Sequence, residues 1–224
     1  MREKFEEELR LLNEYLVEMG ELCRQSIAKV LQAVKGDDTV FADIQKLESE
    51  IDGKEKEIES LCLKLILRQQ PVAGDLRLVS AALKMISDLE RIGDQCSDIV
   101  DNLRFLKRSQ AADLESAVEI EAMAEETMEM ITKAIHAFVN RDLELAREVS
   151  RSDDQVDALF GKVKSEIIGL IAAHPDKGEA CLDLLMIAKY FERIGDHSTN
   201  VAEWVEFSVT GHHPDEAAVQ STGV

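Results

Sequence analysis

The hexapeptide LERIGD at residues 89–94 returns as FERIGD at residues 191–196, and this repetition organises the rest of the sequence. The two copies are 102 residues apart, and two of the three prolines, Pro71 and Pro175, are 104 residues apart. A short match can arise by chance in a charged chain, but two independent markers return here at nearly the same spacing. The sequence therefore predicts an internal tandem duplication.

Apolar residues recur at spacings of three and four along six long stretches, which is the pattern of amphipathic helices. Gly36, Pro71 and Pro175 mark the ends of stretches, because glycine and proline interrupt a helix. Helices are expected over roughly residues 5–36, 37–70, 72–107, 113–140, 142–173 and 178–209. Long helices joined by short links pack as antiparallel neighbours. The predicted fold is all-α, with two tandem antiparallel three-helix bundles.

The expected domain organisation follows from this duplication. A first bundle, a linker with the sequence RSQAAD, a second bundle and a tail are expected over residues 1–107, 108–113, 114–210 and 211–224. The tail is polar, rich in small residues and without periodicity, so we expect it to be disordered. His212 and His213 lie in it and are expected to be solvated, although adjacent histidines could also chelate a metal.

The composition excludes several classes of protein. With 26 Lys and Arg against 45 Asp and Glu, the formal charge is -19, which opposes binding to nucleic acid or to an anionic membrane surface. The first residues are charged throughout, and no apolar run is long enough for a spanning helix, so a cytoplasmic protein without membrane insertion is expected. Four irregularly spaced cysteines are expected to be reduced core residues.

The glycine within each hexapeptide lies inside a predicted helix. An unbroken heptad pattern passes through Gly93, formed by Ala82, Met85, Leu89, Ile92, Cys96, Ile99, Leu103 and Leu106. An interior glycine costs about 1 kcal/mol relative to alanine, and the chain accepts this cost at both Gly93 and Gly195. We therefore expect another backbone or a ligand to approach closely at both positions.

Acidic residues follow one stripe of each repeated helix, on the side away from the heptad pattern. The first stripe holds Glu90, Asp94, Asp98 and Asp101, and the second holds Glu192, Asp196, Asn200 and Glu203. Stacked carboxylates repel one another, and a hard or borderline cation would relieve the repulsion. Arg91 and Arg193 are built-in competitors for this role. The alternative interpretation is an ordinary solvated helix face.

At this point the sequence resembles a known family. LKMISDLERIGDQCSDIVDN at residues 83–102 and LLMIAKYFERIGDHSTNVAEW at residues 184–204 are similar to the two signature helices of the PhoU family of phosphate-specific transport regulators. QPVAGDLRLVSAALK at residues 70–84 matches the pattern that precedes the first signature. The resemblance covers roughly residues 5–209.

The resemblance implies a pair of three-helix bundles that hold metal clusters and have no enzymatic activity. It also implies that the protein represses the phosphate-starvation response by linking the ATPase of the phosphate ABC transporter to a sensor histidine kinase. The protein would then lie in the cytoplasm, held at the inner face of the membrane through its partners. Iron, zinc, manganese and magnesium all stay open as the metal, and so does the choice between a monomer and a homodimer.

Carried over by residue, the family motif gives Glu90, Asp94, Asp98, Glu192, Asp196 and Asn200 as metal ligands. Asn200 replaces the aspartate of the first copy, and a neutral amide predicts a weaker second site. Supporting ligands are expected among the remaining acids of the stripes and of the middle helices, namely Asp101, Glu203, Glu48, Asp52, Asp153, Asp154 and Asp157. His197 is expected to face water rather than a metal.

Other functions find less support in the sequence. A ferritin-like di-iron centre needs Glu-x-x-His pairs, which the sequence lacks, and no nucleotide-binding or hydrolase motif is present. Direct phosphate sensing is not favoured, because no arginine cluster or glycine-rich loop is visible. The remaining alternative to a phosphate regulator is an acidic helical accessory protein for metal or metal-phosphate transport.

Overall fold

The computed structural model describes residues 2–108 and 119–214, and this part of the chain is built from helices. The six long helices are α1 (Arg2–Val34), α2 (Phe41–Gln69), α3 (Gly74–Arg108), α4 (Ile120–Asn140), α5 (Leu143–Ala173) and α6 (Gly178–Thr210). Two short 3-10 turns, η1 (Asp38–Val40) and η3 (Pro175–Lys177), precede α2 and α6. The predicted all-α class is confirmed.

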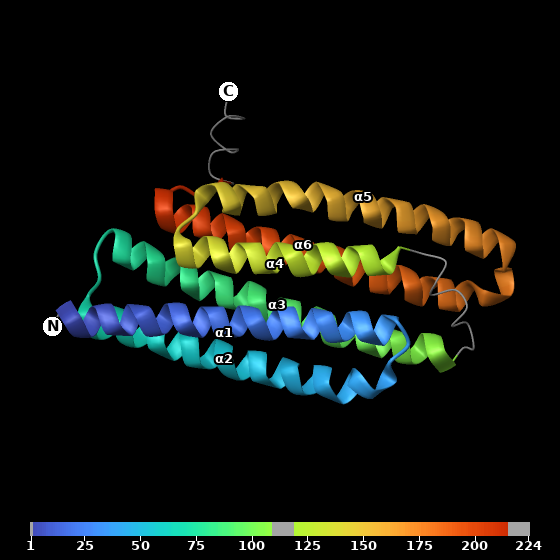
Figure 1. Ribbon diagram of the computed structural model, residues 1–224, viewed down its shortest axis with the longest axis horizontal. Helices are drawn as coiled ribbons and strands as arrows, with labels where there is room; N and C mark the ends of the chain where they lie inside the picture. The colour runs from blue at the N-terminus through green and yellow to red at the C-terminus, as the bar shows by residue number, and fades with distance from the viewer. Residues whose placement is uncertain (1, 109–118, 215–224) are drawn as a thin grey trace, which may run out of the picture.

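Helices α1 to α3 pack together as one antiparallel bundle, and α4 to α6 pack as a second (Figure 1). The halves lie side by side, with α3 against α6 and α1 against α4. Helices α3 and α6 run in opposite directions along the long axis of the molecule. The predicted pair of tandem three-helix bundles is therefore confirmed. Nearly all of the predicted linker lies outside the described residues, so the domain limits stay predictions.

The connection from the first to the second helix uses the same chemistry in both halves. Gly36 has φ +98° and Arg141 has φ +53°, so each half turns through the left-handed region after its first helix. In both halves the next residue is an aspartate whose carboxylate accepts a hydrogen bond from a backbone N–H. Asp37 accepts from Thr39, and Asp142 accepts from Glu144. These caps satisfy amide groups that would otherwise lack partners at a helix start.

The core runs along the predicted apolar seams. All eight residues of the α3 heptad pattern are buried, and so are the four cysteines, which are free thiols. The cysteines therefore behave as core residues, as predicted. None of the described helices is both long enough and apolar enough to span a membrane.

The two signature glycines lie where α3 and α6 meet the middle helix of their own half. A Cβ at Gly93 would lie 3.0 Å from Ile51 Cδ1 on α2. A Cβ at Gly195 would lie 3.3 Å from Val156 Cγ1 and 3.2 Å from Asp153 Oδ1 on α5. A close approach is present at both positions, but the approaching groups are side chains of the neighbouring helix rather than the predicted backbone or ligand.

Candidate metal centre

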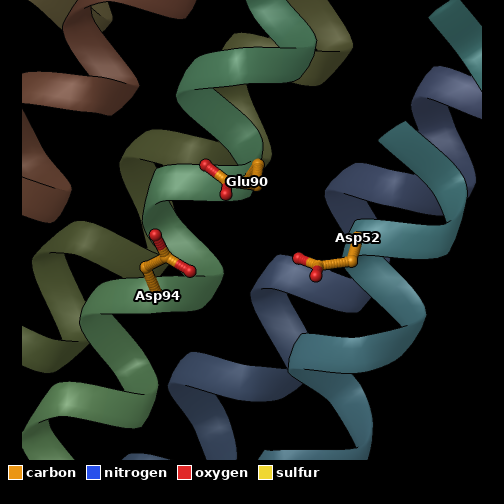
Figure 2. Close-up of side chains that lie close together, drawn as sticks. All are labelled: Asp52, Glu90 and Asp94. Atoms are coloured by element: carbon orange, nitrogen blue, oxygen red, sulfur yellow. The ribbon is translucent and has the colours of Figure 1, made fainter. Parts of the chain in front are cut away.

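Three carboxylates of the first half converge between α2 and α3. One oxygen each of Asp52, Glu90 and Asp94 lies within 4.8 Å of the others, and the three side chains point toward one another (Figure 2). Glu90 and Asp94 are one helical turn apart on α3, while Asp52 comes from α2 and directly follows Ile51. Because Gly93 lets Ile51 approach α3, the same contact brings Asp52 to the α3 carboxylates.

The electrostatics of this acidic cluster favour a cation. Burial, followed by the charge of Asp94, raises the pKa of Glu90, and Arg91 offsets only part of this rise. Glu55 lies one turn after Asp52, and burial together with Glu59 and Asp52 raises its pKa as well. Sequence reasoning missed Glu55, although its spacing from Asp52 places both on one face of α2. A cation would relieve the repulsion among all of these groups.

Arg91 is the internal competitor that the sequence predicted. Its Nη1 lies 3.0 Å from Asp94 Oδ2 and its Nε lies 3.5 Å from Glu90 Oε2. The Arg91 side chain is 59% exposed, so solvent screens both ion pairs and each contributes only about 0–1 kcal/mol. A divalent ion could replace Arg91 at a small cost in free energy.

The other predicted acids of the first half lie beside the cluster rather than within it. Burial raises the pKa of Asp98, and so do the charges of Asp94 and Asp101. Arg193 from the other half lowers it. Glu48 accepts a hydrogen bond from Ser97 Oγ at 2.8 Å. Asp101 pairs with Arg104 at 2.8 Å. These acids line an adjoining pocket, together with Asp94.

The second half places acids of α5 near acids of α6. Burial raises the pKa of Asp153 to about 6, with further contributions from Asp196, Asp157, Glu192 and Asp154 in that order. The predicted supporting acids of α5 thus interact with the signature acids of α6. Within the described residues, however, the only group of three acids close enough to share one ion is that of the first half.

Lys189 explains this difference between the halves. It forms an ion pair with Glu192, one turn later on α6, and its ammonium lies 5.4 Å from the centre of the Phe160 ring. Burial and Glu192 raise the pKa of Asp196, and Lys189 is the strongest group opposing this rise. The internal cation of the second half is therefore Lys189 rather than the predicted Arg193, which acts on Asp98 instead.

Asn200 and His197 take part in a contact between the halves. Asn200 Nδ2 donates to Asp88 Oδ1 at 3.0 Å, and His197 Nδ1 lies 2.9 Å from the same oxygen. The amide of Asn200 is thus bound to α3, which favours a structural role over metal ligation. The expectation that His197 faces water is wrong, because Asp88 holds its ring. Asp88 itself was not singled out from the sequence.

Near the end of α6, Glu203 was predicted as a supporting metal ligand, and His213 beyond it was predicted to be solvated. Glu203 lies beside His213, with 4.0 Å between its Oε2 and the Nε2 of the ring. The ring centres of His213 and Trp204 are 4.4 Å apart, so His213 packs on the helix instead of being solvated. Residues 215–224 of the predicted tail lie outside the described residues.

The donor set of the acidic cluster fits a divalent metal. All three groups offer carboxylate oxygens, which magnesium, manganese, iron and zinc accept as ligands. Metal–oxygen distances of roughly 2.0–2.6 Å allow ligand oxygens on opposite sides of one ion to be separated by the spacing seen here. Asp52, Glu90 and Asp94 would hold such an ion between α2 and α3.

Comparison with known proteins decides the family. The model of the PhoU domain matches residues 16–103 and again residues 120–205. The chain belongs to the PhoU family. The double match agrees with the duplication predicted from the repeated hexapeptide.

Relatives of the PhoU family are similar over almost the whole chain. A homologue of the phosphate-specific transport system accessory protein PhoU from Clostridium acetobutylicum is 35% identical, covering 96% of this chain and 98% of the relative. The corresponding homologue from Deinococcus radiodurans is also 35% identical, covering 94% and 99%. The crystal structure of PhoU from Pseudomonas aeruginosa superposes with a TM-score of 0.82 at 27% identity, covering 93% of this chain and all of that chain.

Proposed function

We propose that this protein is a non-enzymatic regulator of phosphate uptake and of the phosphate-starvation response. Its relatives over nearly the full length are accessory proteins of a phosphate-specific transport system. In this role the protein links the ATPase of the phosphate ABC transporter to a sensor histidine kinase, from the cytoplasmic side of the membrane.

The metal part of the proposal rests on one observation, the convergence of Asp52, Glu90 and Asp94 from two helices. A bound ion would convert the repulsion among these carboxylates into a link between α2 and α3. The signature helix would then hold one position against its neighbour, which presents a defined surface to a partner. A second, weaker site would use Asp153, Asp157, Glu192 and Asp196, with Lys189 as its competitor.

A second candidate function is an acidic accessory protein for metal or metal-phosphate transport. The net charge of -19 and the presence of interacting acids in both halves favour it. The two functions differ in what loss of the protein does to gene expression and to metal content.

Deletion of the gene tests the first function against the second. In cells grown at high phosphate, the regulator predicts constitutive output from a phosphate-starvation reporter, because repression is lost. The transport accessory predicts an unchanged reporter and an altered cellular metal content. A plasmid copy carrying Asp94→Asn, compared with one carrying Asp75→Asn at an exposed aspartate of α3 outside the cluster, then asks whether the acidic cluster is needed for repression.

A further inference from the structure

Exposed apolar side chains gather at the end of the molecule that lies away from the N-terminus. Helix α3 ends there, and α5 turns there into α6 (Figure 1). Four large apolar residues of these helices leave between 42% and 61% of their surface exposed. We call them the end patch, and they are Phe105, Ile168, Leu182 and Met186.

The packing of α5 on α6 brings part of the end patch together. Gly195 of α6 lies against Asp153 and Val156 of α5. Leu182 comes 13 residues before Gly195 on α6. Because the two helices run antiparallel, Leu182 lies across from residues 166–169 of α5, which come 13 residues after that contact and include Ile168.

The packing of α3 on α6 brings in the remaining residues. A pocket of about 420 Å³ joins the end of α3 to the start of α6, and it is lined by Phe105, Arg108, Glu179 and Asp183. Leu182 is next to Asp183 in the chain, and Met186 follows Leu182 by about one helical turn. Helix α6 is therefore the centre of the end patch, with Ile168 on one side and Phe105 on the other.

The fold does not require apolar residues at the centre of this patch. By the spacing of the repeated hexapeptides, Leu182 and Met186 stand where the first half has Ser80 and Lys84. Ser80 and Lys84 are also exposed, so these helix positions face solvent in both halves. Only the second half places apolar side chains there. A group of exposed apolar residues that the core does not use is typical of a contact surface for another protein.

The polar border of the end patch is acidic and lacks a counter-charge. The carboxylates of Glu179 and Asp183 form no ion pair and no hydrogen bond with the described residues. Burial, followed by the charge of Glu179, raises the pKa of Asp183. Arg108 lines the same pocket, but its Cζ lies over the Phe105 ring, 5.8 Å from the ring centre. A cation from outside the chain would relieve the repulsion between the two carboxylates.

We propose that the end patch is a docking surface for a basic amphipathic helix of a partner protein. Apolar anchors one turn apart on that helix pack on Leu182 and Met186, and methionine adapts readily to the shape of an anchor. Lysine or arginine residues beside the anchors pair with Glu179 and Asp183. The described residues offer no strand edge to an extended segment, so a helix is the element that fits this surface.

The charge of the whole chain favours this occupant over a second copy. A net charge of -19 attracts a basic partner from a distance and repels another molecule of the same protein. The docking role deepens the adaptor role of the proposed function and rests on it for the existence of a partner. It does not depend on metal, because the end patch shares no residue with the acidic cluster.

Fluorescence anisotropy with a synthetic peptide tests the apolar part of this surface. The probe has about 18 residues, enough for an isolated helix, with leucine on one face and lysine on the other. Leu182→Ser combined with Met186→Ser should weaken its binding at least about tenfold, because both anchors lose their contacts. Leu63→Ser combined with Leu67→Ser is the matched control, since these exposed leucines are also one turn apart but lie on α2 beside Lys64 and Arg68. This control should change binding less than about twofold.

A second pair of double variants tests the role of charge. Glu179→Gln combined with Asp183→Asn should weaken binding of the lysine peptide about tenfold. Glu7→Gln combined with Glu14→Gln removes the same charge from exposed positions of α1 and should leave binding within about twofold of wild type. Equal losses in the two charge pairs, or in the two apolar pairs, would show that the peptide follows net charge alone, and the proposal would be wrong. Circular dichroism of each variant shows whether the helices are intact.

Sedimentation velocity distinguishes a partner helix from a second copy. If the wild-type chain forms a dimer that Leu182→Ser combined with Met186→Ser abolishes, the end patch joins two copies and the proposal is wrong. A single monomeric species for both proteins, together with binding of the peptide at the end patch, supports docking of a partner.

The reporter strain separates this surface from the proposed function. In cells that lack the chromosomal gene, a plasmid copy with Leu182→Ser and Met186→Ser should fail to repress the phosphate-starvation reporter, whereas the Leu63 and Leu67 control should repress it. If deletion raises the reporter and the end-patch variant represses it fully, the regulatory function stands and the docking proposal fails. If deletion leaves the reporter unchanged, the regulatory function fails, and binding of the lysine peptide at the end patch is still decided by the anisotropy measurements.

Discussion

The two halves of the molecule share a backbone plan but neutralise their acids in different ways. In the first half, Asp52, Glu90 and Asp94 converge, and the cation paired with them is the exposed Arg91. In the second half, Lys189 pairs with Glu192 and no equally tight group forms within the described residues. The acids of the first half are therefore arranged to bind an external ion, whereas those of the second half are partly neutralised by Lys189.

Two positions account for most of this divergence. By the spacing of the repeated hexapeptides, Lys189 stands where the first half has Ser87. By the spacing that relates Ile51 to Val156, Phe160 stands where the first half has Glu55. At these two positions the second half has an aromatic ring in place of an acid and a base in place of a serine, and the ring supports that base through a cation–π contact. Duplication preserved the packing while the charge of the site changed.

The strongest test removes the carboxylate shared by the cluster and the pocket. Asp94→Asn should weaken divalent metal binding in the first half by at least about 100-fold, because loss of a mere hydrogen-bond partner of a ligand costs roughly 10–100-fold. Asp196→Asn should have a much smaller effect. Isothermal titration with Mn²⁺ measures both. Equal losses for the two variants would contradict the asymmetry, and Asp75→Asn, at an exposed aspartate of α3 outside the cluster, serves as the matched control.

Removal of the internal cation should make the halves more alike. Lys189→Met should strengthen metal binding in the second half by about tenfold, which corresponds to about 1.4 kcal/mol, because Glu192 becomes available as a ligand. The metal content at saturation should rise accordingly. Ser87→Lys, the reverse change in the first half, should weaken binding there. Unchanged affinity in both variants would show that Lys189 is not what separates the halves.

The raised pKa of Asp153 predicts a pH-dependent stability in the metal-free protein. Its native pKa of about 6 exceeds the ordinary value of 3.8, so the native state binds this proton more tightly than the unfolded state. Stability contributed by this group is therefore lost as pH rises from about 4 to about 6, and the penalty is complete above that window. Asp153→Asn should be more stable than wild type by about 1 kcal/mol at pH 7, after allowance for solvent screening, and equal to it near pH 4.

Urea denaturation in the presence of a chelator at the two pH values measures this difference. Glu48→Gln is the corresponding change in the first half. A stability gap for Asp153→Asn that stays the same from pH 4 to pH 7 would show that charge is not its cause.

The smallest expected effect concerns the helix contact beneath the acidic cluster. Gly93→Ala places a methyl group 3.0 Å from the flexible end of Ile51, so the Ile51 side chain must give by a few tenths of an ångström. The strain and the gain in helix propensity are of similar size, so stability should change by less than about 1 kcal/mol. Metal affinity of the first half should fall only a few-fold, and Ile51→Val in the same chain should restore it. No change in affinity would mean that this contact does not position Asp52.

The sequence predicted most of the fold because its markers act within one helix. The heptad pattern through Gly93 and the stop at Pro71 depend on near neighbours in the chain. For the same reason, the α3 stripe containing Glu90 and Asp94 could be recognised from residue spacing alone.

The parts of the site that were missed depend on contacts between helices. Asp88 meets His197 across 109 residues, and the partners of such a contact follow from how α3 crosses α6. Lys189 lies only three residues from Glu192, but the ring of Phe160 that supports it comes from α5. Arg193 was expected to serve its own half, and the packing turns it toward Asp98 instead.

The pairing of α3 with α6 and of α1 with α4 means that the first and third helices of each half contact their own counterparts in the other half. This is the arrangement of a twofold-symmetric homodimer whose subunits have been fused into one polypeptide. A fragment ending after α3 would expose the apolar flank that α6 covers in the intact chain. Expressed alone, such a fragment should therefore be found as a self-associated pair, which would represent the unduplicated ancestor of the present chain.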